Sequence, residues 1–152
     1  MIYAYYKTKI GFIKFSYEDL IKKIELVDKV STNDEKSEIT DRVFFEIEEY
    51  LENKRKIFTS YELLDTSLSP FQRKVLSELR KIPYGKTSTY KKLSEKIARP
   101  RAYRPVARAL ATNPFFIIYP CHRVKKSDGS LGGFAYGEKV KEYLLNLEKG
   151  GR

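Results

Sequence analysis

Cysteine, histidine and tryptophan are almost absent from this chain of 152 residues. Cys121 is the only cysteine, His122 is the only histidine, and there is no tryptophan. Because a single cysteine cannot form an internal disulfide, the composition fits a reducing compartment such as the cytoplasm. One cysteine and one histidine are also too few for a structural zinc site built only from these residue types, which needs about four ligands. We therefore predict neither a metal nor a cofactor.

Long hydrophobic runs are missing as well. The longest apolar stretch, FFIIY at 115–119, suits a buried strand or an extended segment and is far shorter than the roughly 18 residues of a membrane-spanning helix. The N-terminal residues MIYAYYKTK lack the basic start and apolar core of a signal peptide. Gln72 is the only glutamine, whereas lysine, glutamate and isoleucine are abundant, which is typical of proteins from thermophiles. The sequence thus predicts a cytoplasmic protein that does not enter the membrane.

Negative charge is scarce in the second half of the chain. Residues 1–69 contain 11 Lys/Arg and 14 Asp/Glu, whereas residues 70–152 contain 19 and 6, so that the second half has a net charge of +13. A concentration of positive charge favours a polyanionic partner, most simply nucleic acid. Charge alone leaves open the alternative that the lysines only keep the protein soluble.

The first half of the chain has the pattern of a small mixed α/β domain. Aromatic and β-branched residues dominate 2–15, and a further short run follows at 22–27. These patterns predict two strands joined by a turn, and then a third strand. From Glu38 onwards apolar residues recur at helical spacing, and the basic residues 54–56 suit the C-terminal end of that helix. A polar linker then ends this first domain, which we expect to span 1–66.

The second half, 67–152, has the pattern of a mostly helical domain. Serine and proline at 69–70 form a good N-cap and first residue of a helix. Two short helical segments follow at about 88–97 and 102–111, and two short helices joined by a tight turn are typical of a helix-turn-helix. A simple helical hairpin with a basic, solvent-exposed face would give the same pattern. A last helix is expected at about 137–149, so the whole chain falls in the α/β (α+β) class.

The two rare residues are adjacent, in PCHRV at 120–124. A thiol attacks as the thiolate, and its ordinary pKa of roughly 8.5 keeps most of it protonated at neutral pH. His122 could accept that proton directly or through a water, and Arg123 adds positive potential. A helix start at Pro120 would add the partial charge of free backbone N–H groups. All three effects predict a lowered pKa and a nucleophilic Cys121.

Two other interpretations of Cys121 remain open on these grounds. A lone cysteine is usually a buried, inert residue, and His122 would then be an ordinary hydrogen-bonded imidazole. A cysteine hydrolase with His122 as its base would also use this pair, but it would not need the basic second half of the chain. The adjacency of the two residues behind a proline, and the rarity of both types, favour the reactive interpretation.

At these residues the sequence resembles the O6-alkylguanine-DNA alkyltransferases, also called methylated-DNA–protein-cysteine methyltransferases. The segment PCHRV matches the active-site motif of that family. Three further segments are similar to family motifs: PYGKTSTY at 83–90, YRPVARALATNP at 103–114 and GGFAYGEKVKEYLLNLE at 132–148. The resemblance covers about 70–150, whereas the first half, which is RNase H-like in the family, matches only in size and α/β character.

The resemblance implies roles for particular residues. Cys121, His122 and Glu148 would form a chain of cysteine, water, histidine and glutamate. Arg104 would occupy the space left by a nucleotide rotated out of the duplex, while Tyr90 would crowd its phosphate and donate a hydrogen bond to the flipped base. By the same resemblance, Asn113 would brace the turn under the active site and Lys141 would lie near the O6 side of the base. The other residues that the resemblance assigns to the site are Arg101, Arg108 and Arg123 on DNA, and Pro120, Val124 and Ala135 around the base.

The function implied by the resemblance is DNA repair. Members of this family bind double-stranded DNA that carries O6-alkylguanine and transfer the alkyl group irreversibly to their cysteine, once per molecule; O4-alkylthymine is a further candidate substrate. We expect a monomer, which could bind cooperatively along DNA. The alternative is a module that binds alkylated DNA without repairing it. Relatives of that kind have tryptophan in place of the cysteine, which this chain retains at Cys121.

Overall fold

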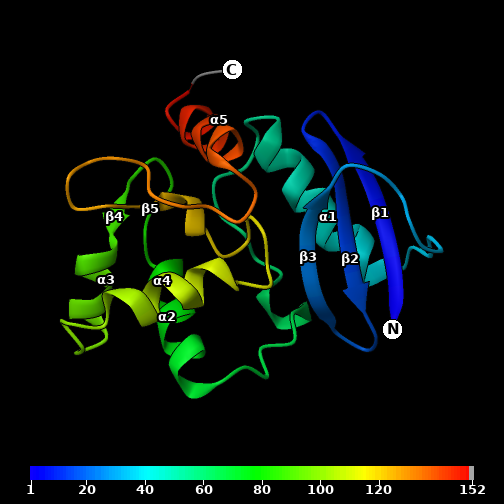
Figure 1. Ribbon diagram of the computed structural model, residues 1–152. Helices are drawn as coiled ribbons and strands as arrows, with labels where there is room; N and C mark the ends of the chain where they lie inside the picture. The colour runs from blue at the N-terminus through cyan, green and yellow to red at the C-terminus, as the bar shows by residue number, and fades with distance from the viewer. Residues whose placement is uncertain (151–152) are drawn as a thin grey trace. The chain divides into compact units, whose positions relative to one another are not determined.

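The computed structural model describes residues 1–150, which form two compact units of mixed α and β structure (Figure 1). The first unit consists of Met1–Ser67 together with Pro114–Ile118. The second contains Leu68–Asn113 and the chain from Tyr119 onwards. The first break falls one residue later than we expected, and the segment before the cysteine, which we expected in the second domain, belongs partly to the first unit.

A three-stranded antiparallel sheet forms the framework of the first unit. β1 (Ile2–Thr8), β2 (Gly11–Tyr17) and β3 (Ile21–Val27) lie in this order, each paired with the next. All three strands agree with the sequence prediction. Gly11 closes the first hairpin with a φ of 131°, and a Cβ there would lie 3.1 Å from the carbonyl oxygen of Val27. Only glycine fits this turn without displacing the neighbouring strand.

The helix α1 (Glu38–Leu51) contacts β1 and buries its apolar face. Ser37 caps its N-terminus: its side chain accepts a hydrogen bond from the backbone N–H of Thr40, and the Thr40 side chain accepts one from the N–H of Ser37. The basic residues 54–56, which we predicted at the end of this helix, instead follow it. The helix ends before them, where Asn53 turns the chain with a φ of 61°.

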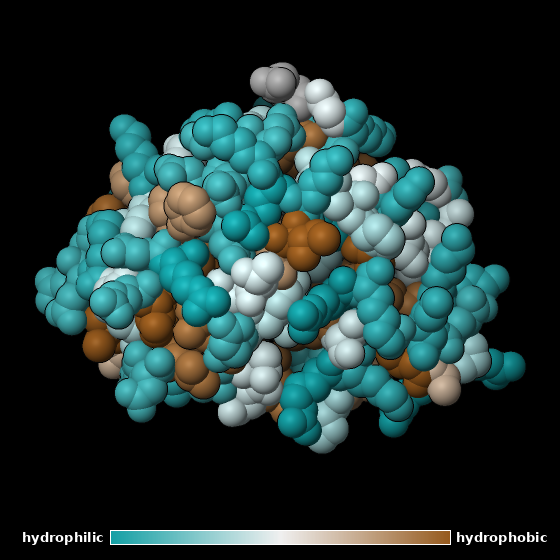
Figure 2. Space-filling view, turned by 180° about the vertical axis from the view of Figure 1, so that it is seen from behind, coloured by the Kyte–Doolittle hydropathy of each residue, from teal (hydrophilic) through white to brown (hydrophobic). Residues whose placement is uncertain are grey.

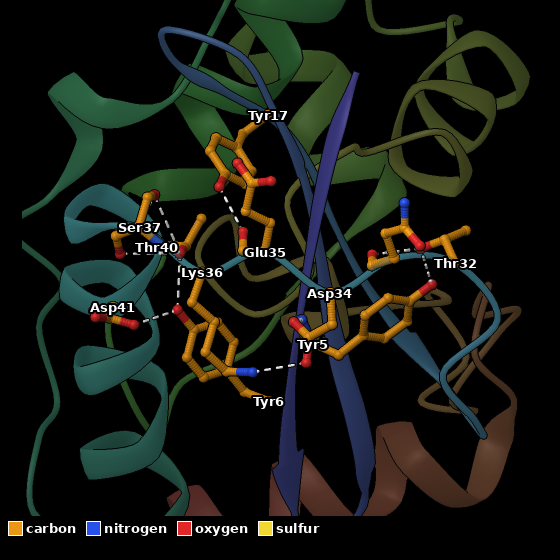
Figure 3. A network of polar contacts seen from close by, with 11 residues as sticks. Tyr5, Tyr6, Tyr17, Thr32, Asp34, Glu35, Lys36, Ser37, Thr40 and Asp41 are labelled. Atoms are coloured by element: carbon orange, nitrogen blue, oxygen red, sulfur yellow. Dashed lines mark hydrogen bonds and ion pairs between the residues drawn. The ribbon is translucent and has the colours of Figure 1, made fainter.

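The loop at 31–36 lies along the edge of β1 (Figure 3). The backbone N–H of Tyr5 donates to Asp34 Oδ1 (2.9 Å), and the N–H of Glu35 donates to a carbonyl oxygen of β1 (2.7 Å). The hydroxyl groups of Tyr5 and Thr32 are 2.8 Å apart. The loop therefore satisfies backbone groups that an edge strand would otherwise present to other chains.

The opposite edge of the sheet is covered by Pro114–Ile118. The N–H of Ile24 in β3 donates to the carbonyl oxygen of Pro114 (2.7 Å), and the N–H of Phe116 donates to the carbonyl oxygen of Ile24 (3.0 Å). The apolar stretch FFIIY therefore begins as an extended segment beside the sheet, one of the two structures that the sequence allowed. The short 3₁₀ helix η1 (Tyr61–Leu63) is the remaining helical element of this unit.

Four α-helices make up most of the second unit. In chain order they are α2 (Pro70–Arg80), α3 (Tyr90–Lys96), α4 (Tyr103–Ala111) and α5 (Glu138–Glu148). A parallel pair of two-residue strands, β4 (Ser88–Thr89) and β5 (Val124–Lys125), and the 3₁₀ helix η2 (Cys121–Arg123) complete the unit. All four helices agree with the prediction to within a few residues at their ends.

The N-terminal caps of these helices agree with the sequence in one case and differ in another. Ser69 caps α2, as predicted, because its side chain accepts a hydrogen bond from the N–H of the third helical residue. We predicted Thr87 or Ser88 as the cap of α3. The cap is Thr89, whose Oγ1 accepts a hydrogen bond from the N–H of Lys92 (3.1 Å). The difference arises because Ser88 is paired in β4, so the helix can begin only after that strand.

The helices α3 and α4 pack together and are joined by a tight turn, as a helix-turn-helix requires. Two hydrogen bonds at the end of α3 form a Schellman motif. The N–H of Arg99 donates to the carbonyl oxygen of Ser94, five residues earlier (2.8 Å), and the N–H of Ala98 donates to that of Glu95, three residues earlier (3.0 Å). Ala98 has a φ of 60°, in the left-handed region where glycine is the usual residue. A single methyl group therefore strains this turn.

Within residues 1–150, no helix is long and apolar enough to cross a membrane. On the face drawn in Figure 2, hydrophobic residues form separate patches within a largely hydrophilic surface. The exposed large hydrophobic residues include Phe45 at 56% and Ile57 at 73%. Scattered apolar residues of this kind are normal on the surface of a folded protein.

We predict that Ala98→Gly stabilises the protein. Glycine adopts a positive φ without the steric cost of a Cβ, so the free energy of unfolding should rise by about 1 kcal/mol. Urea unfolding of the variant and of the unsubstituted protein measures this difference. Ala111→Gly is the matched control, because Ala111 is exposed in the last turn of α4 and has no positive φ. Its free energy of unfolding should fall by about 0.5–1 kcal/mol. An equal fall in the free energy of unfolding of both variants would contradict the strain at Ala98.

Candidate active site

Cys121 lies in a cleft of the second unit. The cleft has a volume of about 620 Å³, and apolar atoms dominate its lining. The exposed fraction of Cys121 is 8%, so the residue is buried except where it meets the cleft. The walls come from α3, α4 and the glycine-rich loop after β5, and include Tyr90, Arg104, Arg108, Phe134 and Ala135.

The backbone around Cys121 is fixed by a side-chain bond and by the short parallel sheet. Asn113 Nδ2 donates to the carbonyl oxygen of Tyr119 (2.9 Å), and the N–H of Cys121 donates to the same oxygen (2.8 Å). Val124 begins β5, which pairs with β4. Since β4 leads directly into α3, whose first residue is Tyr90, this pairing brings Tyr90 and Cys121 to the same cleft.

His122 and Arg123 both bind the carboxylate of Glu148, the last residue of α5. His122 Nε2 lies 2.6 Å from Glu148 Oε2. Arg123 donates from Nε to Oε1 (2.9 Å) and from Nη2 to Oε2 (3.0 Å). The backbone N–H of Gly85 also donates to Oε1 (3.0 Å). The three residues are buried, with exposed fractions of 1% for His122 and 6% for the other two. They form a network in which both carboxylate oxygens are hydrogen-bonded.

The structure does not support the predicted contact of Arg123 with DNA. Besides its bonds to Glu148, its guanidinium donates from Nη1 to the carbonyl oxygen of Ile82 (2.8 Å). A buried guanidinium that is bonded in this way is not available to a phosphate of DNA. Arg123 instead holds Glu148 in place beside His122.

These contacts decide the protonation of Glu148, whereas burial decides that of His122. Burial alone would raise the pKa of Glu148, but the hydrogen bonds and charges of His122 and Arg123 lower it to about 2. Burial lowers the pKa of His122, against the opposing influence of Glu148. At neutral pH the site therefore combines an ionised carboxylate with a neutral imidazole that can accept a proton.

The pKa of the Cys121 thiol is shifted in the direction opposite to our prediction. Burial raises it, while a hydrogen bond from Asn113 and the positive charge of Lys141 act against this rise. The predicted lowering fails because the thiol is almost fully buried and because Arg123 is bound to Glu148. The helix that begins at the cysteine, η2, is also only three residues long. The thiol therefore stays protonated until a base removes its proton.

Lys141 ties the glycine-rich loop to α5. Its side chain is fully buried, and its Nζ donates to the carbonyl oxygens of Leu131 and Gly133, the latter at 3.2 Å. Burial lowers its pKa to about 8, although the charge of Cys121 favours its protonated form. The structure thus brings Lys141 within electrostatic range of the thiol while using it to shape the loop.

The wall opposite the helices contains some of the residues expected around the base. Ala135 lines the cleft, whereas Val124 and Pro120 are buried and do not belong to its lining. The hydroxyl of Tyr90 donates to the carbonyl oxygen of Gly133 at 3.5 Å, which is a weak bond. Burial, and then the charge of the nearby thiol, raises the pKa of Tyr90, so its hydroxyl keeps its proton and can donate it.

Besides the buried Arg123, three arginines were expected on DNA, and two of them reach the cleft. Arg104 and Arg108 lie on α4, are exposed and line the cleft. Arg101 is exposed just before α4 and does not line the cleft. Arg104 and Arg108 therefore border the cleft that contains the thiol, whereas Arg101 lies outside it.

Sequence reasoning missed seven of the residues that line the cleft, and three of these, Tyr103, Lys126 and Phe134, have large side chains that bear on recognition. Tyr103 is 43% exposed at the start of α4. Two of the three adjoin residues that the sequence did single out, since Tyr103 precedes Arg104 and Phe134 precedes Ala135. An aromatic residue beside a motif residue was the available signal for both.

The residues described, 1–150, contain no group of three or more His, Cys, Asp or Glu side chains that could hold a metal ion. The histidine and the carboxylate of the site already bind each other. The arrangement instead supplies a thiol, a base and hydrogen-bond donors, which are the groups that nucleophilic catalysis needs.

Known proteins show close similarity to this chain. Residues 70–150 match the family model for the DNA-binding domain of 6-O-methylguanine DNA methyltransferase. A probable methylated-DNA–protein-cysteine methyltransferase of Acanthamoeba polyphaga mimivirus is 37% identical over 94% of this chain and 93% of its own length. The methylated-DNA–protein-cysteine methyltransferase of Methanosarcina barkeri is 50% identical over 58% of this chain and 58% of its own length.

A solved structure extends the likeness to the first unit. Mycobacterium tuberculosis OGT in complex with DNA matches with a TM-score of 0.88 and 28% identity, covering 99% of this chain and 94% of that chain. The family model thus spans more than half of the sequence, and the viral relative nearly all of it. The chain therefore belongs to the 6-O-methylguanine DNA methyltransferase family, whose members are also named methylated-DNA–protein-cysteine methyltransferases.

Proposed function

We propose that this protein repairs DNA by transferring an alkyl group from the O6 atom of guanine to the sulfur of Cys121. The observation that carries this proposal is the place of Cys121 in a cleft walled by α3 and α4. These two helices pack together as in a helix-turn-helix and lie within residues 70–150, which match the DNA-binding domain of the family. A nucleophile and a DNA-binding element therefore border the same cavity.

DNA binds to the basic face of the helix-turn-helix. Arg101, Arg104 and Arg108 are exposed there, in the half of the chain with a net charge of +13. Because the O6 atom cannot reach a protein sulfur from within the duplex, the alkylated nucleotide must rotate out, which costs a few kcal/mol. Arg104, exposed and at the cleft, enters the space that the nucleotide leaves in the base stack.

The cleft suits a purine base. Its volume of about 620 Å³ lies in the range of roughly 300–1,000 Å³ that is usual for small-molecule sites. Phe134 and Tyr90 supply aromatic surface, and Leu110 supplies aliphatic surface. Gly133 and Ala135 carry little or no side chain, so the base can approach the backbone of the loop.

The thiol loses its proton before transfer. His122 is neutral and Glu148 is ionised, so the imidazole accepts the proton of Cys121 through a bridging water, and the carboxylate stabilises the imidazolium that forms. Asn113 and Lys141 favour the thiolate through a hydrogen bond and a positive charge. The buried thiol is therefore activated within the site instead of being ionised in the resting protein.

The thiolate then displaces guanine from the alkyl carbon in one in-line step. The bond from Sγ to carbon forms as the bond from carbon to O6 breaks, and the electron pair of the broken bond stays on guanine. Tyr90 donates its hydroxyl proton to the leaving base, and the proton that His122 took from the thiol is passed through water to the Tyr90 oxygen, so guanine leaves neutral and both side chains return to their resting protonation states. The product is a thioether without a good leaving group, so each protein molecule reacts once.

A module that binds alkylated DNA without repairing it is the second candidate. It would share the helix-turn-helix and the cleft. The buried pair of His122 and Glu148 behind Cys121 favours repair, because a binding module has no need of a base at this position. A cysteine hydrolase would instead turn over many times on acyl substrates and would have no need of the basic helices.

Incubation with duplex DNA that contains O6-methylguanine should add the mass of one methyl group to the protein, on Cys121. Intact-mass spectrometry followed by peptide mapping measures both the mass and its position. The yield should stop at one methyl group per protein molecule. Cys121→Ser should bind the same duplex with similar affinity and gain no mass. Tight binding by the unsubstituted protein without any gain in mass would support the non-catalytic module.

Arg104→Ala should slow the repair of duplex DNA more than the reaction with free O6-benzylguanine. We expect a loss of about tenfold on the duplex, equivalent to about 1.4 kcal/mol, because only the duplex requires the vacated stack to be filled. Single-turnover rates on both substrates measure the ratio. Arg101→Ala removes the same charge outside the cleft and serves as the control. Equal losses on the two substrates for Arg104→Ala would contradict its place in the base stack.

Glu148→Gln should destabilise the protein and flatten the acid end of its stability profile. The pKa of Glu148 is about 2 in the folded protein and about 4.3 when unfolded. A lowered pKa stabilises the fold above the unfolded value, and this contribution disappears as the pH falls through the folded value. We expect a loss of about 3 kcal/mol at pH 7, shrinking toward pH 2.

Urea unfolding at pH 7 and at pH 3 measures this contribution of Glu148. Glu142→Gln is the control, because Glu142 is an exposed glutamate of the same helix. Alkyl transfer by Glu148→Gln should also slow, since a neutral amide stabilises the imidazolium less well than a carboxylate. A stability difference that does not depend on pH would show that the carboxylate charge is not the source of the effect.

A further inference from the structure

Ile117 has an unusual backbone conformation four residues before Cys121. Its φ is 69°, in a region that β-branched residues rarely occupy because Cβ approaches the following carbonyl oxygen. The N–H of Ile118 donates to the carbonyl oxygen of Phe116 (2.8 Å), so Ile117 is the central residue of a γ-turn. A γ-turn with a positive central φ is the rare, strained kind. The Ile117 side chain is 1% exposed, so the turn is not a feature of a loose surface loop.

Hydrogen bonds on both sides hold this turn in place. Before it, the N–H of Phe116 donates to the carbonyl oxygen of Ile24 (3.0 Å), and the N–H of Ile24 donates to Pro114 (2.7 Å). After it, the carbonyl oxygen of Ile118 accepts from the hydroxyl of Tyr61 (3.2 Å). A strained conformation persists only where its surroundings over-determine it, and such residues cluster at functional sites.

A second turn follows and ends at the active-site cysteine. Pro120 has a φ of −80° and a ψ of 65°, and the N–H of Cys121 donates to the carbonyl oxygen of Tyr119 (2.8 Å). This is the common, unstrained kind of γ-turn. The same oxygen of Tyr119 accepts from Asn113 (2.9 Å). Asn113 therefore holds the second turn at Tyr119, and only Ile118 separates that residue from the strained turn at Ile117.

We propose that Ile117 is a positioning residue for alkyl transfer, and that its strained turn is retained because it places the sulfur of Cys121 against Asn113 and Lys141. The proposal rests on the proposed function of Cys121. A relaxed conformation at Ile117 lengthens the chain before Tyr119 and moves the sulfur away from the groups that favour its thiolate. Ile117 acts through the backbone and does not touch the substrate.

Alanine and glycine at one position separate the backbone from the side chain. Both Ile117→Ala and Ile117→Gly remove the buried isoleucine side chain, and they differ by one methyl group. Glycine reaches a positive φ without steric cost, but it also reaches the relaxed conformations that alanine prefers. Ile118 is the control position, because its side chain is also buried, at 3% exposure, and its φ is not positive.

Thermal unfolding and single-turnover transfer from free O6-benzylguanine are measured for alanine and glycine at both positions. At 117 the glycine variant should melt about 2–4 °C above the alanine variant, because it relieves strain. The alanine variant, which has lost the isoleucine side chain and disfavours a positive φ, should transfer about tenfold more slowly than the glycine variant, and the midpoint of its rate–pH profile should lie at higher pH. At 118 the glycine variant should melt below the alanine variant, with the same midpoint. A merely structural role for Ile117 would leave the midpoint of both variants unchanged.

The unsubstituted protein in the same assay tests the proposed function itself, and without transfer there both proposals fail. If it transfers, a glycine variant at 117 that melts below the alanine variant shows that no strain is present. Equal transfer rates for the glycine and alanine variants at 117 show that the positive φ has no part in placing the sulfur. Either result overturns the role of Ile117. If these variants do not fold, Ile117→Leu and Ile118→Leu replace them, since leucine tolerates a positive φ better than isoleucine. Only the former should then be stabilised, and it should keep the transfer rate and the midpoint of the unsubstituted protein.

Discussion

The buried carboxylate of Glu148 is the contact on which the architecture of the site depends. It joins the end of α5 to His122 and Arg123 in η2 and to the backbone of Gly85 after α2. An ionised group in this position is tolerated only because each of its oxygens is hydrogen-bonded, and loss of the carboxylate would leave a buried guanidinium without its counter-charge. The group that orients the base is therefore also one that holds the second unit together.

Burial has opposite consequences for the ionisable groups that surround this carboxylate. It raises the pKa of the Cys121 thiol and lowers those of His122 and Lys141. All three shifts favour the neutral form. The thiol and the imidazole therefore rest without charge, whereas Lys141, with a pKa of about 8, stays mostly protonated at neutral pH. A proton needs to move only a short way, from sulfur to imidazole, for the nucleophile to form. Protection of the thiol from adventitious oxidation follows from the same arrangement, since oxidants attack exposed thiolates first.

Local patterns in the sequence were sufficient for most elements and for the identity of the nucleophile. Helical spacing located α1, α2 and α5, and the rarity of cysteine and histidine pointed to Cys121 and His122. Features that depend on contacts between residues distant in the sequence were predicted poorly. The role of Arg123 changed because its partner lies 25 residues away, and the thiol was assigned the wrong pKa direction because burial cannot be read from its neighbours. The turn at Ile117 is unpredictable for the same reason, since propensity disfavours it and the residues that hold it, Ile24 and Tyr61, are distant in the sequence.

Because Cys121 is the only cysteine, the number of free thiols in a sample equals the number of protein molecules that have not reacted. Denaturation of the unreacted protein exposes one free thiol per chain, whereas the alkylated protein has no free thiol to expose. Because no other thiol contributes to the signal, titration of the denatured protein with a chromogenic disulfide measures the fraction of molecules that have not been alkylated. A sample that has met damaged DNA thus keeps a permanent stoichiometric record of how many lesions it has removed.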